Sequence, residues 1–98
     1  MEAVFFIEKE KYPRARDLAS SDDVVSRQSL TFREAMSLGL HEEGYYLLVS
    51  GTDEGIAKAR KVLKGLAREL KGEEGRGVKD LMKKQEEEAM EGFGGIFG

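Results

Sequence analysis

The clearest pattern of apolar and polar positions lies between residues 45 and 71, where signals for a strand, a turn and a helix follow one another. Residues 45–49, Tyr-Tyr-Leu-Leu-Val, form an apolar run bounded by Gly44 and Gly51. An apolar run of this length, rich in aromatic and β-branched side chains and bounded by glycines, is typical of a buried strand. We expect the rest of the chain to pack around this unit.

A helix is predicted directly after this strand, over residues 53–71. Thr52 offers a side-chain oxygen to the first helical turn, and two acidic residues follow where the helix dipole favours negative charge. Apolar residues then recur at spacings of three and four, which places them on one side of a helix. These residues are Ile56, Ala59, Leu63, Leu66, Ala67 and Leu70. Gly72 is the predicted end of the helix.

Weaker patterns precede this unit. Residues 3–8 predict a strand, and its two adjacent phenylalanines point to opposite faces, so we expect the strand to be covered on both sides. Residues 14–23 predict a polar, partly helical connection, and residues 24–30 predict a short second strand. The first strand is the stronger of the two predictions, because its apolar run is denser.

A second short helix is predicted before the strand of residues 45–49. Thr31 and Glu34 have the spacing of a capping box, in which each side chain satisfies a backbone donor near the other. This pattern predicts a helix over residues 32–38, and Gly39 suits the left-handed stop after it.

The alternation of helix and strand predicts an α+β fold, a small two-layer α/β sandwich. We expect about three strands packed by the helix of residues 53–71, with an additional C-terminal helix. A fourth strand could come from residues 12–30 or from a second subunit. The predicted organisation is a compact domain over residues 1–72, a glycine-rich hinge over 73–77, and a C-terminal helix and tail over 78–98.

The C-terminal helix has one narrow apolar face on an otherwise very polar sequence. The positions on this face are Val78, Leu81, Met82, Gln85 and Ala89. A helix of this kind needs a partner surface to be stable. That surface is either the sheet of the same chain or the surface of another chain.

The last residues combine glycine with large apolar side chains. Phe93, Ile96 and Phe97 are too apolar for a solvated tail, although four glycines between residues 92 and 98 make ordering costly. With the acidic run before it, the segment from Glu86 to Gly98 resembles the acidic Gly/Phe C-terminus of archaeal ribosomal stalk proteins. The resemblance covers thirteen of the 98 residues, and the body has neither the helical dimerisation domain nor the Ala-rich hinge of that family.

In the stalk family the tail recruits translation GTPases by placing apolar side chains in a groove. The resemblance implies that Phe93, Ile96 and Phe97 anchor this chain in a partner groove, as a short amphipathic peptide does. The alternative is that these aromatic residues fold back onto the domain or onto a second copy. We therefore predict a protein-binding surface made of Leu81, Met82, Phe93, Ile96 and Phe97.

Composition narrows the classes of protein. The chain has 98 residues, no cysteine and a formal net charge of −3, which suits one domain without disulfides or thiolate metal sites. Its high Glu and Lys content, with no cysteine and a single proline, suits a heat-tolerant protein of thermophilic origin, and the resemblance of the tail implies an archaeal one. No apolar run approaches the about 18 residues of a membrane span, and the first residues do not resemble a secretory signal. We expect a cytoplasmic protein with no membrane association.

A stripe of basic residues supports an alternative hypothesis, that the chain binds RNA or the ribosome. The predicted helix of residues 53–71 carries Lys61, Lys64, Arg68 and Lys71 on its polar face, which is a possible contact for RNA or the ribosome. Residues 1–72 hold twelve bases and twelve acids, however, whereas a nucleic-acid-binding domain normally has a clear positive excess. We therefore favour a non-catalytic protein-interaction module, expected to be a homodimer, over an RNA-binding protein.

Motifs for catalysis are few. The single histidine, His41, lies in an acidic turn, and the paired carboxylates lack the alternating spacing of a Ca²⁺ or Mg²⁺ loop. No phosphate-binding glycine loop or nucleophile motif is present in the sequence. We predict no catalytic residue, no cofactor and no metal site. A ligand-sensing or enzymatic role is a third, weaker hypothesis.

Overall fold

The structure, a computed structural model, describes residues 1–97, with side chains described for residues 1–89. Four strands form one sheet, and its spatial order is β2-β3-β1-β4 with every neighbouring pair antiparallel. The strands are β1 (Glu2–Glu8), β2 (Ser29–Glu34), β3 (Gly44–Ser50) and β4 (Arg68–Leu70). The sequence predicts about three strands, and the fourth is the short edge strand β4.

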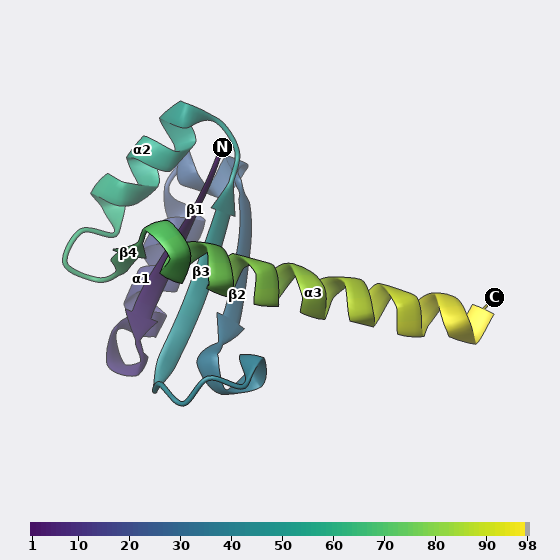
Figure 1. The fold of residues 1–98 in the computed structure, drawn as a ribbon. Coiled ribbons are helices and arrows are strands. Elements are labelled where there is room, and N and C mark those ends of the chain that lie inside the picture. The colour runs from purple at the N-terminus through teal and green to yellow at the C-terminus, as the bar shows by residue number, and fades with distance from the viewer. Residues whose placement is uncertain (98) are drawn as a thin grey trace.

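Three α-helices and three short 3₁₀ helices connect and cover the strands. The α-helices are α1 (Tyr12–Ser21), α2 (Asp53–Val62) and α3 (Gly72–Phe97), and the 3₁₀ helices are η1 (Lys9–Lys11), η2 (Val25–Arg27) and η3 (Ala35–Leu38). The order β1-α1-β2-β3-α2-β4 with this sheet is the split βαβ, or ferredoxin-like, arrangement. The predicted α+β class is confirmed, and α3 adds a third layer (Figure 1).

Each face of the sheet has its own core. On one face, Phe5 and Ile7 of β1 pack with residues of α1 and α2, such as Ala15 and Ile56. On the other face, the alternate residues of β1 and β3 pack with α3. The strand predicted over residues 3–8 is confirmed as a central strand, because it pairs with β3 on one side and β4 on the other. Its two faces are covered by the two cores.

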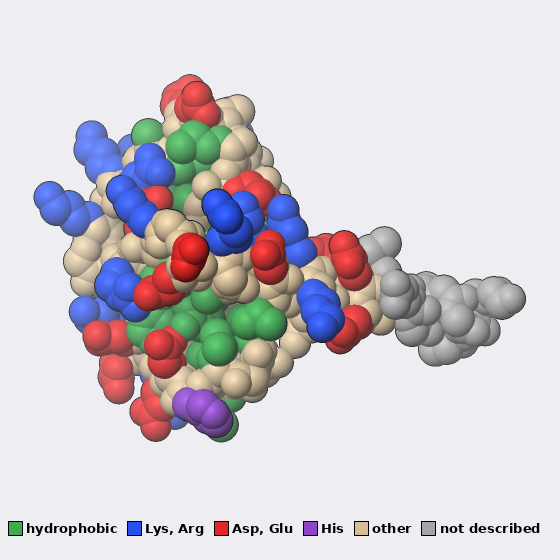
Figure 2. Space-filling model, in the orientation of Figure 1, with side chains coloured by type: hydrophobic (Ala, Val, Ile, Leu, Met, Phe, Trp, Pro, Cys, Tyr) green, Lys and Arg blue, Asp and Glu red, His purple; other side chains and the backbone are tan. Residues whose placement is uncertain are grey.

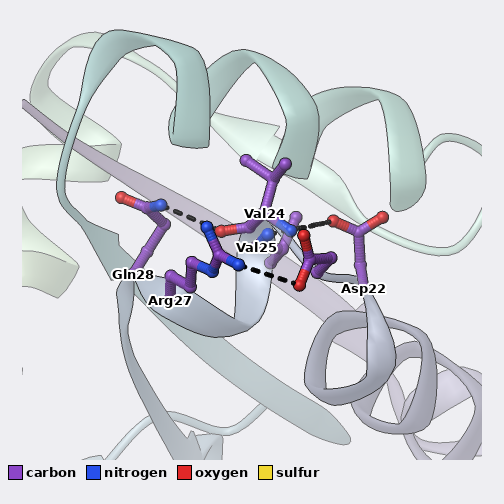
Figure 3. A network of polar contacts seen from close by, with 6 residues as sticks. Asp22, Val24, Val25, Arg27 and Gln28 are labelled. Carbon is purple, nitrogen blue, oxygen red and sulfur yellow. Dashed lines mark hydrogen bonds and ion pairs between the residues drawn. The ribbon is translucent and has the colours of Figure 1, made fainter.

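The turn between α1 and β2 is closed by side-chain hydrogen bonds (Figure 3). The Asp22 carboxylate accepts hydrogen bonds from the backbone N–H groups of Val24 and Val25, at 3.0 and 2.9 Å. The Gln28 amide nitrogen donates to the carbonyl of Val24 at 2.9 Å, and its oxygen accepts from the N–H of Thr52 at 3.0 Å. These bonds tie η2 to the start of α2, so the network has a structural role.

The start of α2 is as predicted, but its end is not. The Thr52 hydroxyl accepts a hydrogen bond from the N–H of Gly55 at 3.0 Å, which confirms the N-cap. The prediction of one helix over residues 53–71 is wrong, because α2 ends at Val62 and Gly65 follows with a φ of +81°. A left-handed glycine is a common helix stop. Leu66 and Ala67 still pack on the α1/α2 side of the sheet, which is why their spacing resembled a helix.

The helix predicted over residues 32–38 is also wrong in its first half. Residues 29–34 form β2, which pairs with β3 from Ser29↔Ser50 to Glu34↔Tyr45, and only the 3₁₀ helix η3 follows. Hydrogen bonds along a six-residue strand pair more backbone N–H and C=O groups than a short capped helix could. The short strand predicted over residues 24–30 begins only at Ser29, since residues 25–27 form η2. Gly39, with a φ of +80°, ends η3 as predicted.

Residues 73–77, which the sequence predicts to be a hinge, form the first turns of α3 in this structure. Gly75 is buried there, and a Cβ atom on it would lie 2.7 Å from the backbone oxygen of Leu70. Gly75 thus lets α3 turn back closely against the end of β4. Gly77, two residues later, has no atom within 4 Å of such a Cβ.

We expect opposite effects from alanine at these two glycines. Gly75→Ala must displace α3 from the Leu70 carbonyl and should lower the free energy of unfolding by about 1–3 kcal/mol. Gly77→Ala should raise it by about 0.5–1 kcal/mol, because alanine is the better helix former at an open position. Urea denaturation of the two variants checks this pair. Equal effects of the two substitutions would contradict the close approach of α3 to β4.

Candidate protein-interaction surface

The helix α3 lies across the face of the sheet that α1 and α2 leave open. Its side chains Val78 and Met82 are 7% and 2% exposed and belong to the same buried cluster as Val4, Leu48 and Leu70. The first half of α3 therefore finds its partner surface on its own chain. Of the two alternatives left open by the sequence, the structure shows the fold-back for this half of the helix.

Ion pairs hold the same part of α3 to the start of β1. The Glu2 carboxylate lies 3.5 Å from the Lys79 ammonium and 3.1 Å from that of Lys83. Partial burial raises the pKa of the Glu2 carboxyl, but the hydrogen bonds and charges of Lys83 and Lys79 outweigh it and leave that pKa below its usual value. Glu2 is thus stabilised in its charged form.

Contacts with the body end near Gln85, and α3 continues. The Gln85 side-chain amide donates a hydrogen bond to the carbonyl of Ser37 in η3, at 2.9 Å. Glu86, Glu87, Glu88 and Ala89 are exposed. Figure 1 shows α3 running past β2, with its yellow end away from the strands. At 1.5 Å per residue, residues 86–97 correspond to roughly 18 Å of helix. We call residues 86–97 the α3 arm.

A shallow groove follows α3 where it passes η3. It measures about 230 Å³, and we call it the α3–η3 groove. Its lining residues are Ser37, Leu38, Leu81, Lys84, Gln85 and Glu88. Leu81 is 37% exposed, and Met36 of η3 is 67% exposed. Figure 2 shows apolar side chains on the surface beside α3, below it in that view. Leu81 is thus a large, exposed apolar side chain that lines this groove, whereas Met36 lines a separate pocket beside Glu42.

The open part of the same sheet face carries an aromatic pair. The rings of Phe6 and Tyr46 lie 5.3 Å apart, and the Arg68 guanidinium lies 5.9 Å from the Phe6 ring. The Tyr46 hydroxyl donates a short hydrogen bond to the Glu42 carboxylate. Burial, and then this hydrogen bond, raise the pKa of the Tyr46 hydroxyl well above its usual value. Tyr46 therefore stays protonated and has the role of a packing residue.

The predicted protein-binding residues fall into three groups. Leu81 is exposed at the α3–η3 groove, and Met82 is buried against the sheet of its own chain. Phe93, Ile96 and Phe97 lie outside the residues whose side chains the structure describes. Leu81 is thus available to a partner, whereas Met82 helps to hold α3 in place.

The predicted basic stripe is divided between two elements and the connections that follow them. Lys61 belongs to α2, Lys64 follows it, Arg68 lies in β4 and Lys71 precedes α3. The Arg68 guanidinium pairs with the Glu74 carboxylate at 3.0 Å on the α3 side of the sheet. The stripe depended on a helix that continues to residue 71, so the end of α2 at Val62 separates these cations.

Several residues of this surface could not be predicted from the sequence. Glu2 and Ser37 bond to side chains of α3 although they are far from it in the sequence, and Lys84 of α3 lines the groove although it is polar. Apolar periodicity gives no signal for such residues. Among the described residues, no group of three or more His, Cys, Asp or Glu side chains could hold a metal ion. His41 is exposed.

The fold and this surface define a ferredoxin-like α+β domain with a third helix across its sheet. Comparison with protein-family models, with curated proteins and with solved structures gives no match. None of the helices within residues 1–97 has the length and apolar character needed to cross a membrane.

We expect the Glu2 ion pairs to stabilise the fold in a pH-dependent way. Because the pKa of Glu2 is lowered in the folded chain, its contribution is present above the unfolded-state pKa and is lost as pH falls through the folded-state pKa. Glu2→Gln should therefore cost up to about 1 kcal/mol at neutral pH, and the difference from the wild type should shrink near pH 3. Urea denaturation at both pH values checks this expectation.

Glu10→Gln is the matched control for this experiment, since Glu10 is exposed and forms no ion pair with the described residues. It should change stability little at either pH. A Glu2→Gln difference that grows in acid would show that the ion pairs do not hold α3.

Proposed function

We propose that this chain is a non-catalytic protein-interaction module that presents the α3 arm to a protein partner. The observation that carries the proposal is the course of α3. The helix is packed and ion-paired against the sheet up to Gln85, and it then continues beyond the β2 edge with exposed side chains from Glu86 to Ala89. A helix anchored at one end presents its other end in a defined direction.

The composition of the arm supports a partner-bound helix. Glycine at positions 92, 94 and 95 disfavours an isolated helix by about 1 kcal/mol each relative to alanine. Phe93, Ile96 and Phe97 are spaced by three and one residues, which suits a short amphipathic helix that places apolar side chains in a groove. Burial in a partner groove would offset the cost of the glycines.

The acidic run before these anchors indicates the chemistry of the partner. Glu86, Glu87 and Glu88 are exposed and form no ion pair within 4 Å among the described residues. An apolar groove flanked by lysine or arginine would complement the arm. A cytoplasmic location is part of the proposal, since the chain has no cysteine.

We expect the arm to contact a protein in the cell. A photo-crosslinking amino acid in place of Ala89 should give adducts that resist nuclease and are destroyed by protease. Deleting residues 91–98 should lower their yield at least roughly tenfold, because each lost anchor removes buried apolar area. Gel analysis and mass spectrometry of the adducts measure the effect.

Two controls accompany this measurement. The same crosslinker at Ser20, which is exposed on α1, should give no such adduct. The deletion should change the free energy of unfolding of the body by no more than about 0.5 kcal/mol. Unchanged adducts together with a destabilised body would instead indicate that the tail folds back on its own domain.

The same experiment tests the RNA-binding alternative. Nuclease-sensitive adducts, and RNA binding that weakens with salt and is lost in a Lys61→Glu, Lys64→Glu variant, would support that function instead. These two lysines are exposed and lie in and after α2.

A further inference from the structure

The charge of α3 changes sign at the point where the helix leaves the body. Two lysines, Lys83 and Lys84, directly precede Gln85, and three consecutive glutamates, residues 86–88, follow it, whereas residues 72–82 hold two bases and three acids. Gln85 donates a hydrogen bond to the carbonyl of Ser37 in η3, and Glu88 also lines the groove beside η3. Lys83 and Lys84, the basic part, thus lie directly before Gln85, and the three glutamates, the acidic part, lie directly after it.

Such a charge order is self-complementary under a two-fold axis. Two copies of α3 that cross antiparallel near Gln85 would place the basic part of each helix beside the acidic part of the other. A two-fold interface uses the same surface patch on both subunits, so one patch must carry both charges. Parallel helices would instead place like charges side by side, which is unfavourable.

The α3–η3 groove provides this patch. Leu38 and Leu81 supply its apolar part, and Lys84 and Glu88 supply its two charges. Neither Lys84 nor Glu88 forms an ion pair within 4 Å among the described residues, although they are four apart on one helix. Both charges are therefore available to another chain, on the same side of α3 as the exposed Leu81.

The edge of the sheet next to this groove is also unpaired. Among the described residues, β2 pairs only with β3, so its outer side presents free backbone groups over Ser29–Glu34. A free edge of this length is a ready template for another strand. The groove alone is too small for a stable interface, which buries about 1,200 Å² or more in total. The β2 edge and the arm would supply the additional buried area.

We propose that the occupant of the α3–η3 groove is a second copy of this chain. The two α3 helices cross antiparallel near Gln85, with Lys84 of each subunit beside Glu88 of the partner subunit. The inference rests on the proposed function and identifies the partner as the chain itself. The change of charge around Gln85, from two lysines to three glutamates, is what favours a second copy over another protein.

Two single charge reversals test this arrangement. Lys84→Glu and Glu88→Lys each place like charges across the two-fold axis, so each variant alone should dimerise roughly tenfold or more weakly than the wild type. A 1:1 mixture of the two variants restores both attractive pairs between chains, and it should form a heterodimer of near wild-type affinity. Sedimentation equilibrium of each protein and of the mixture, with one variant fluorescently labelled, measures these affinities.

The mixture separates contacts between chains from contacts within one helix. Residues 84 and 88 are four apart, so each variant also carries a like-charge pair on its own α3. Mixing leaves that pair unchanged and alters only the pairing between chains. Circular dichroism should show that both variants keep the wild-type fold, since Lys84 and Glu88 are exposed. Lys64→Glu, an exposed reversal in another element, should dimerise as the wild type does.

The inference is overturned if the wild type is monomeric up to roughly 1 mM, where even a weak interface is populated. It is also overturned if both variants dimerise like the wild type, or if the mixture stays monomeric. These failures differ from a failure of the proposed function. A monomeric chain whose position 89 still crosslinks to another protein would keep the interaction module and reject only the second copy as its partner.

Discussion

The packing of α3 on the second face of the sheet is the contact on which the rest of the structure depends. With α1 and α2 both on one side, the residues Val4, Leu48 and Leu70 on the other side would be exposed to water. Val78 and Met82 of α3 bury them, and Gly75 lets the helix approach the end of β4 closely. Removal of apolar area from water is the main favourable term in folding, so a sheet of this kind needs such a cover.

This contact also sets the direction of the arm. The helix α3 starts beside β4 at one edge of the sheet and passes η3 near the other edge, so its continuation leaves the body past β2 (Figure 1). The Glu2 ion pairs with Lys79 and Lys83 hold the helix on its course. A single side chain on β1 thus helps to decide where residues 86–97 are presented.

The polar side chains of the body have mostly structural partners. Asp22 and Gln28 close the turn before β2, and Gln28 also accepts a hydrogen bond from Thr52 at the start of α2. The Arg60 guanidinium pairs with the Glu69 carboxylate at 2.7 Å, and the Tyr46 hydroxyl bonds to Glu42. Among the described residues, no buried side-chain nitrogen or oxygen lacks a hydrogen-bond partner. Lys84 and the three glutamates that follow Gln85 are exposed and form no ion pair within 4 Å among the described residues.

The sequence by itself determined the elements whose signals are local. The run Tyr45–Val49, the cap at Thr52 and the strand over residues 3–8 follow from side-chain type and spacing, and the structure confirms all three. The tertiary structure decided whether the pattern after Val62 was one helix or a turn and a strand, because apolar spacing across Gly65 fits both. It also decided that residues 29–34 pair with β3 instead of forming a helix. The candidate surface was predictable only at Leu81, since Glu2, Ser37 and Lys84 gain their roles from where α3 is placed, and long-range packing fixes that place.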